Sequence, residues 1–173
     1  TKSRQCIYSD WTALSQKGES PPAFVGTPGY IAPEMLATQL LGANDSARRL
    51  PDDHSDLHAL ATTIYALLFH RHPLRGPKVH DQSDADRDEM LSMGEFALFV
   101  EHSRDTSNRP PDLEKGCDAF GSEMESLFRR AFETGLNNPH VRPTAAEWSE
   151  AITECLAQRK SLAVLPGNII VTD

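Results

Sequence analysis

Two residues in the first part of the chain, Asp10 and Thr27, have a type and a setting suited to chemistry. Asp10 ends a short β-prone run over residues 6–9 and precedes a polar loop. A carboxylate in such a place can hold a divalent cation, although the pattern alone is more typical of a turn at the end of a strand. Thr27 carries the hydroxyl in the compact turn formed by residues 26–30. By itself this turn predicts only a loop.

Two charged residues far apart in the sequence, Glu34 and Arg142, could belong together. Glu34 lies in the first turn of a short predicted helix that Pro33 opens and that runs to about Leu41. Arg142 precedes another predicted helix. Each can be an ordinary surface charge. If both are buried they need each other, because an unpaired buried charge is very costly.

The histidines His54 and His58 are four residues apart in a predicted helix and could therefore share a metal ion. The glutamate that follows the first histidine of a helical zinc motif is replaced by Ser55, and no third ligand is evident. The sequence therefore does not favour a zinc site. No Gly-x-Ser-x-Gly segment supports a Ser/His/Asp triad either.

The elements that must position these residues are mostly helices. The strongest pattern predicts a central helix over residues 54–70, because leucine, isoleucine and alanine recur there at helical spacing. Asp52, Asp53 and Asp56 at its start suit the positive end of the helix dipole. His70 and His72 suit its end, and Pro73 follows. The broad apolar face predicts a helix that is buried on nearly all sides.

Two further helices are predicted within residues 122–158, and each begins with a capping box: Ser122 with Glu125, and Thr144 with Glu147. Gly135 is placed to end the first of them. Residues 89–101 predict another helix, and the rest of residues 74–116 reads as irregular. The predicted fold class is mainly α, with a short β segment at the N-terminus.

Composition and charge exclude several classes of protein. The 17 basic residues are outnumbered by 25 acidic ones, giving a net charge of −8, which does not suit a nucleic-acid binder. The longest apolar run, over residues 57–69, is too short and too mixed to span a membrane. Three cysteines far apart suggest neither a disulfide framework nor a zinc site, so a reducing, cytoplasmic setting is expected. The first residue is Thr1 rather than Met, which leads us to expect a piece of a longer product.

Four of these features follow one another in the order found in Ser/Thr protein kinases. Residues 26–34, Gly-Thr-Pro-Gly-Tyr-Ile-Ala-Pro-Glu, resemble the end of the kinase activation segment. Asp10-Trp11-Thr12 stands where the family has Asp-Phe-Gly. Residues 55–60 resemble the start of the central helix of the kinase C-lobe, and residues 138–144 resemble the turn before its last helix. The resemblance covers about residues 6–158, and residues 72–74 and 101–110 suggest a bacterial kinase-like branch.

The resemblance implies a partial kinase C-lobe over residues 1–160. It comprises an activation segment (10–34), the central helix (54–70), an insert (74–116) and the last helices (122–158). Residues 161–173 form a C-terminal tail whose role stays open. The N-lobe and the catalytic loop would lie upstream in the same polypeptide.

The resemblance also implies a reaction, the transfer of the ATP γ-phosphate to Ser or Thr of a protein substrate. Asp10 would bind the Mg²⁺ that bridges the ATP phosphates, and Thr27 would lie in the substrate-docking loop and contact the catalytic machinery. Ser15 and Ser20 fall where activating phosphorylation occurs in many kinases, although serines in such a place are more often ordinary loop residues. No membrane or nucleic-acid partner is implied.

Three residues would have structural roles in such a domain. Glu34 would pair with Arg142 and attach the activation segment to the C-lobe. Asp56 would accept backbone hydrogen bonds from the catalytic loop.

Two departures from the family leave an alternative open. Thr12 replaces the usual glycine, which puts the conformational flip of this motif in doubt. His58 stands where the family often has tryptophan. The alternative is a pseudokinase-type binding or scaffold module without phosphotransfer. In either case we expect the isolated chain to be inactive.

Overall fold

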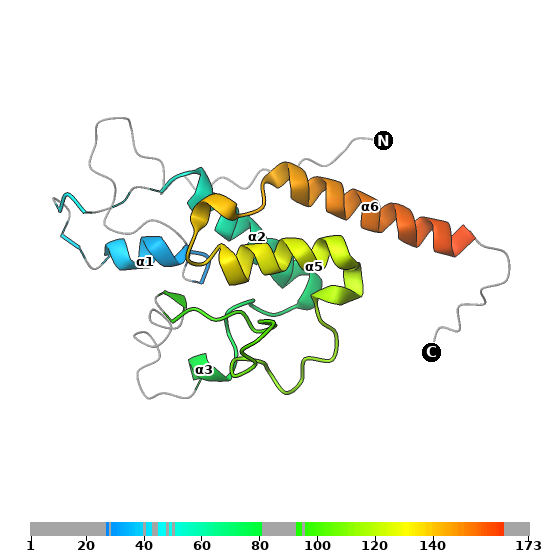
Figure 1. Ribbon diagram of the computed structural model, residues 1–173, viewed down its shortest axis with the longest axis horizontal. Coiled ribbons are helices and arrows are strands. Elements are labelled where there is room, and N and C mark those ends of the chain that lie inside the picture. The colour runs from blue at the N-terminus through cyan, green and yellow to red at the C-terminus, as the bar shows by residue number, and fades with distance from the viewer. Residues whose placement is uncertain are drawn as a thin grey trace.

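The computed structural model describes residues 27, 29–39, 41–42, 45–47, 49, 51–80, 93–94 and 96–164. These residues form helices and turns and no β-strand, so the prediction of a mainly α fold is confirmed for them. The β segment expected near the N-terminus lies outside the described residues. The elements, drawn in Figure 1, are α1 (Pro33–Gln39), α2 (Asp53–Phe69), α3 (Pro77–His80), η2 (Cys117–Phe120), α5 (Ser122–Arg129), η3 (Arg130–Thr134), η4 (Pro139–Val141) and α6 (Ala145–Val164).

The central helix α2 matches its predicted bounds to within one residue at each end. It begins with a capping box, in which Asp52 Oδ1 accepts from the Ser55 N–H and the Ser55 hydroxyl accepts from the Asp52 N–H, both at 3.0 Å. It ends where His70 adopts a left-handed conformation (φ 53°) and donates its N–H to the Ala66 carbonyl. Both ends are therefore set by local hydrogen bonds that satisfy exposed backbone groups.

The hydrophobic core is built around aromatic rings that come from different elements. Tyr65 of α2 is fully buried and contacts Phe99, Phe128 of α5 and Phe132 of η3 with ring centroids 5.2–6.2 Å apart. Trp148 of α6 packs on Phe128 at 4.9 Å. In Figure 1, α5 and α6 accordingly lie beside α2, and the C-terminal part of α6 extends beyond the other helices.

Of the two predicted capping boxes, one forms and one does not. Before α6, the Thr144 N–H donates to Glu147 Oε2 at 2.8 Å and the Glu147 N–H donates to Thr144 Oγ1 at 3.3 Å. Before α5, the prediction was wrong: the helix already includes Ser122, and the capping residue is Gly121, which has no side chain to offer. The Gly121 carbonyl accepts from the Glu125 N–H instead.

The helix predicted over residues 89–101 is contradicted in its described C-terminal part, where residues 97–99 are irregular. Phe99 and Val100 are both fully buried. The backbone groups there form hydrogen bonds to other segments and not within a helix. The Val100 N–H donates to the Pro73 carbonyl, and the Asn108 side chain donates to the Leu98 carbonyl.

Two predicted boundaries also shift. The predicted tail at residues 161–173 begins inside α6, which continues to Val164. Within the insert, residues 77–80 form the short helix α3, where the sequence predicted a loop.

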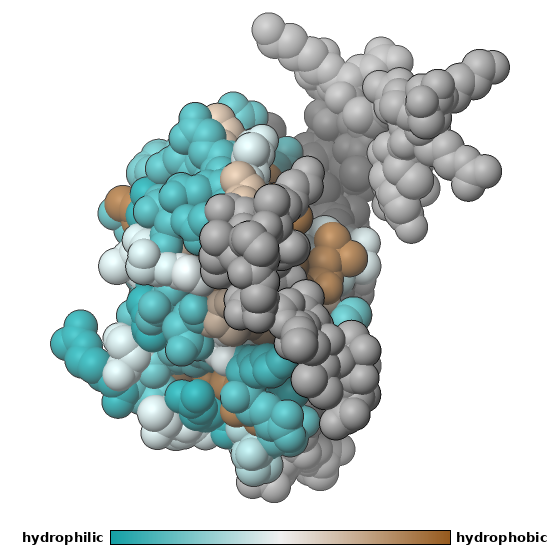
Figure 2. Space-filling view, turned by 90° about the vertical axis from the view of Figure 1, so that its right-hand side faces the viewer, coloured by the Kyte–Doolittle hydropathy of each residue, from teal (hydrophilic) through white to brown (hydrophobic). Residues whose placement is uncertain are grey.

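The surface of the described residues is mostly polar. Figure 2 shows one face on which hydrophilic residues dominate and hydrophobic atoms emerge at a few separate places. Among the described residues, no helix has the length and apolar character needed to cross a membrane. Cys117 and Cys155 are free thiols.

Candidate functional site

The turn that carries Thr27 is closed by a hydrogen bond from the Tyr30 N–H to the Thr27 carbonyl at 3.0 Å. Gly29 occupies the position with a positive φ of 87°, which a side chain would disfavour. Thr27 is exposed, whereas Gly29 is buried. The Gly29 carbonyl lies 2.5 Å from His72 Nε2, so the turn is attached to the segment that follows α2. We call residues 27–30 the docking turn, after the role that the resemblance to kinases implies for Thr27.

Glu34 and Arg142, which are 108 positions apart, meet in a bidentate ion pair. Arg142 Nη1 donates to Glu34 Oε1 at 2.7 Å, and Nη2 donates to Oε2 at 2.8 Å. The Arg142 side chain has no exposed surface, and that of Glu34 is 16% exposed. The guanidinium also donates to two backbone carbonyls, those of Gly135 at 2.9 Å and His54 at 2.8 Å. The contact expected between the two charges is therefore present, and it attaches α1 to the start of α2.

Gly135 makes room for this arginine. A Cβ at this position would lie 2.9 Å from Arg142 Cγ and 2.7 Å from the carbonyl oxygens of Arg130 and Ala131. Gly135 follows η3, a π-helical turn in which the Gly135 N–H bonds back five residues to the Arg130 carbonyl at 2.9 Å. The glycine expected only to end a helix thus also provides space and a carbonyl for Arg142.

The histidines His54 and His58 do not share a site. His54 Nε2 lies 2.9 Å from His140 Nδ1, whereas His58 is buried against the Phe132 ring. Burial, with a smaller contribution from the positive charge of Arg142, lowers the pKa of His58 to about 3, so its ring is neutral. In the part of the chain that the structure describes, no cluster of three or more residues is suited to a metal.

Asp56 is exposed on the first turn of α2. Partial burial raises the pKa of its carboxyl, and the neighbouring carboxylates of Asp53 and Asp52 raise it further. No described residue donates a hydrogen bond to this carboxylate. Asp10, Ser15 and Ser20 lie outside the described residues.

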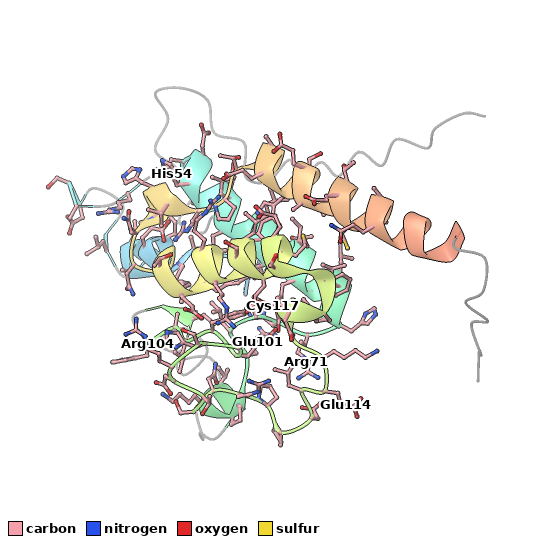
Figure 3. All side chains as sticks on the ribbon, turned by 45° about the vertical axis from the view of Figure 1, so that its right-hand side comes forward. His54, Arg71, Glu101, Arg104, Glu114 and Cys117 are labelled. Carbon is pink, nitrogen blue, oxygen red and sulfur yellow. The ribbon has the colours of Figure 1, made fainter. Side chains whose placement is uncertain are left out.

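A second polar cluster, at the other end of α2, holds a buried carboxylate. Tyr65 donates to Glu101 Oε1 at 2.5 Å, and the Cys117 N–H donates to Oε2 at 2.7 Å. Figure 3 shows Glu101 and Cys117 side by side below α5, away from His54. Burial, together with the charge of Glu101, raises the pKa of the Cys117 thiol to about 12, so the thiol is protonated and unreactive. The adjoining hollow of about 260 Å³ is lined mainly by charged residues.

Sequence patterns missed His72 as a partner of the docking turn, and they missed the carbonyl groups of His54 and Gly135. The histidine at position 72 was assigned to the end of α2, and nothing in its local pattern points to residue 29. Comparison of the chain with protein-family models, with curated proteins and with solved structures gives no match.

Proposed function

We propose that this chain is part of a Ser/Thr protein kinase, in which it contributes the activation segment, the substrate-docking turn and the helical half of the catalytic domain. The observation that carries the proposal is the buried ion pair between Glu34 and Arg142. It joins the glutamate of the Ala-Pro-Glu sequence to the arginine of the Arg-Pro-Thr sequence. These are the two residues for which the resemblance to kinases implies such a contact.

The geometry around this pair suits the positioning of a peptide substrate. The docking turn is closed by its own hydrogen bond, is attached to His72, and is continuous with α1, which Arg142 holds. A substrate hydroxyl is phosphorylated efficiently only if its position is fixed relative to the phosphate. Asp10 would hold the Mg²⁺ of bound ATP, which neutralises the charge on the phosphates.

The character of α2 also supports a larger catalytic domain. Its apolar residues occur on all sides of the helix, and such helices are usually buried on all sides. Leu67 is nevertheless 71% exposed, and Leu57, Leu60 and Ile64 are only partly buried. An element outside the described residues would cover this face, as the catalytic loop and its preceding helix would in a kinase.

Phosphotransfer by the full-length polypeptide tests the proposal. With Mg²⁺, ATP and a library of Ser/Thr peptides, we expect labelled peptide from the full-length protein and none from the 173-residue chain alone. Asp10→Asn should reduce the rate at least about 100-fold, because the metal ligand is lost. Thr27→Ala should reduce it about 10-fold, whereas Thr27→Ser, which keeps the hydroxyl, should be close to wild type.

Two results would contradict the kinase. Unchanged phosphotransfer in both Asp10→Asn and Thr27→Ala would refute the site assignment. A full-length sequence that lacks the strand lysine, the helix glutamate and the catalytic Asp and Asn, together with no phosphotransfer, would favour the scaffold module, to which the Thr12 substitution also points.

A further inference from the structure

We propose that His72 is a positioning residue that fixes the docking turn through a single tautomer of its ring. The proposal rests on the proposed function for the identity of the substrate, a Ser/Thr peptide, and on the observed contacts for the attachment itself. His72 lies three residues beyond the end of α2 and is half-buried. It contacts the docking turn across 43 positions of sequence.

The two ring nitrogens of His72 have different roles. The Leu74 N–H donates to Nδ1 at 3.1 Å, so Nδ1 carries a lone pair and no proton. In the neutral ring the proton is then on Nε2, which donates to the Gly29 carbonyl at 2.5 Å. The backbone of residue 74 therefore selects the tautomer that can hold the docking turn.

The docking turn is shaped to receive this contact. Gly29 has a positive φ, and a Cβ there would lie 3.3 Å from Arg75 Nη2 and 3.6 Å from His72 Nε2. The next residue, Tyr30, places its ring edge-to-face with the imidazole, with centroids 6.2 Å apart. A hydrogen bond and a ring contact thus act on two successive residues of the turn.

The docking turn and the helix α1 that follows it are consequently held at two separate points. Arg142 holds α1 through Glu34, and His72 holds the turn through Gly29. The ion pair contacts only α1, whereas His72 acts on the turn itself, two residues from Thr27. We expect this second contact to fix the position of Thr27 relative to a bound peptide.

Two substitutions separate the roles of the ring nitrogens. His72→Asn places an acceptor near the Nδ1 position and keeps the bond from the Leu74 N–H, but it cannot reach Gly29. His72→Gln places an N–H donor near the Nε2 position and keeps the bond to Gly29. His70→Gly is the matched control at the same end of α2, because glycine accepts the left-handed conformation of residue 70.

Amide hydrogen exchange of the 173-residue chain tests the attachment. We expect His72→Asn to raise exchange of the Tyr30 amide about tenfold, the effect of losing one hydrogen bond, and His72→Gln and His70→Gly to leave it within about twofold. Equal exchange in His72→Asn and in the wild type would overturn the attachment.

Peptide phosphorylation by the full-length protein tests the positioning role. His72→Asn should raise the KM for the peptide about tenfold and leave kcat and the KM for ATP within about twofold, and His72→Gln should restore the peptide KM. An unchanged peptide KM in His72→Asn would overturn this role. If the unaltered full-length protein transfers no phosphate, the proposed function and the substrate role fall together, while the exchange result still decides whether His72 holds the turn.

Discussion

Two polar clusters lie at opposite ends of α2, one around Arg142 near His54 and one around Glu101, and each stabilises its buried charge in a different way (Figure 3). At the His54 end, the buried Arg142 is neutralised by a full opposite charge that lies 108 positions away. At the Glu101 end, the buried carboxylate is bound by neutral donors, the Tyr65 hydroxyl and the Cys117 N–H. The nearby Arg129 pairs with Glu125 and Glu133, each four residues away on a partly exposed surface.

The difference teaches which contacts organise the proposed site. Removing one partner of a buried ion pair is strongly destabilising, because the other charge stays buried without a counter-charge. Removing one of several neutral donors to a buried carboxylate lowers the free energy of unfolding by less. The first cluster therefore fixes α1 against the start of α2, and the second fixes a local loop against α5.

The strongest test of this comparison is Glu34→Gln, which keeps the shape of the side chain and removes its charge. We expect it to lower the free energy of unfolding by about 3–5 kcal/mol, because the Arg142 guanidinium stays buried without a counter-charge. Asp112→Asn is the control: it weakens the pair with Arg71, which also joins distant segments but leaves the Asp112 side chain 76% exposed. Its cost should be below about 1 kcal/mol. Urea unfolding followed by tryptophan fluorescence measures both, and equal costs would contradict the role given to burial.

Acid should lower the free energy of unfolding, because His58, near the His54 end of α2, is neutral in the folded protein and protonated in the unfolded chain. The pKa of His58 is about 3 in the folded protein, against 6.5 for a free histidine, so the unfolded chain binds the proton first as pH falls. The neutral ring thus contributes stability above pH 6.5 that is lost progressively toward pH 3, by about 3 kcal/mol between pH 6.5 and 4. His58→Leu should remove this part of the pH dependence. Identical pH profiles of urea unfolding for the variant and the wild type would show that the ring does not titrate as proposed.

At the Glu101 end, Tyr65→Phe should cost about 2 kcal/mol, the value of one hydrogen bond to a charged group. Burial raises the pKa of Tyr65, and the hydrogen bond to Glu101 raises it further, so the phenol remains a donor at all ordinary pH values. A double-mutant cycle with Glu101→Gln measures the coupling. If the losses of unfolding free energy in the two single variants add up to the loss in the double variant, the phenol and the carboxylate do not stabilise one another.

The smallest expected loss of stability concerns the N-terminal ends of α5 and α6, which lie outside both clusters. Thr144→Ala should cost about 1 kcal/mol, because it removes the capping hydrogen bond to the Glu147 N–H. Ser122→Ala should be close to neutral, because Ser122 makes no capping bond. Thermal unfolding of the two variants gives the comparison directly. A larger loss for Ser122→Ala would mean that α5 begins as the sequence motif predicted.

Local sequence patterns predicted α2 well, because its apolar spacing, its acidic start and Pro73 all agree. They failed over residues 97–101, where long-range bonds to Pro73 and Asn108 override the helical spacing. They could not place Glu34 beside Arg142 either, since no periodicity connects residues so far apart. That contact was expected only from the resemblance to kinases. The tautomer of His72 depends on the position of one backbone N–H, which no residue pattern encodes.

The π-helical turn η3 holds one residue more than an α-helix would over the same rise. Gly135 follows this turn and presents its carbonyl to the Arg142 guanidinium. Because the extra residue is absorbed within the turn, deleting one residue from 130–134 would let the turn return to α-helical winding while the segments on either side keep their phase. A deletion between Gly135 and Arg142 has no such extra residue to absorb it, and it would separate the arginine from its carbonyl even if every side chain of the ion pair were retained.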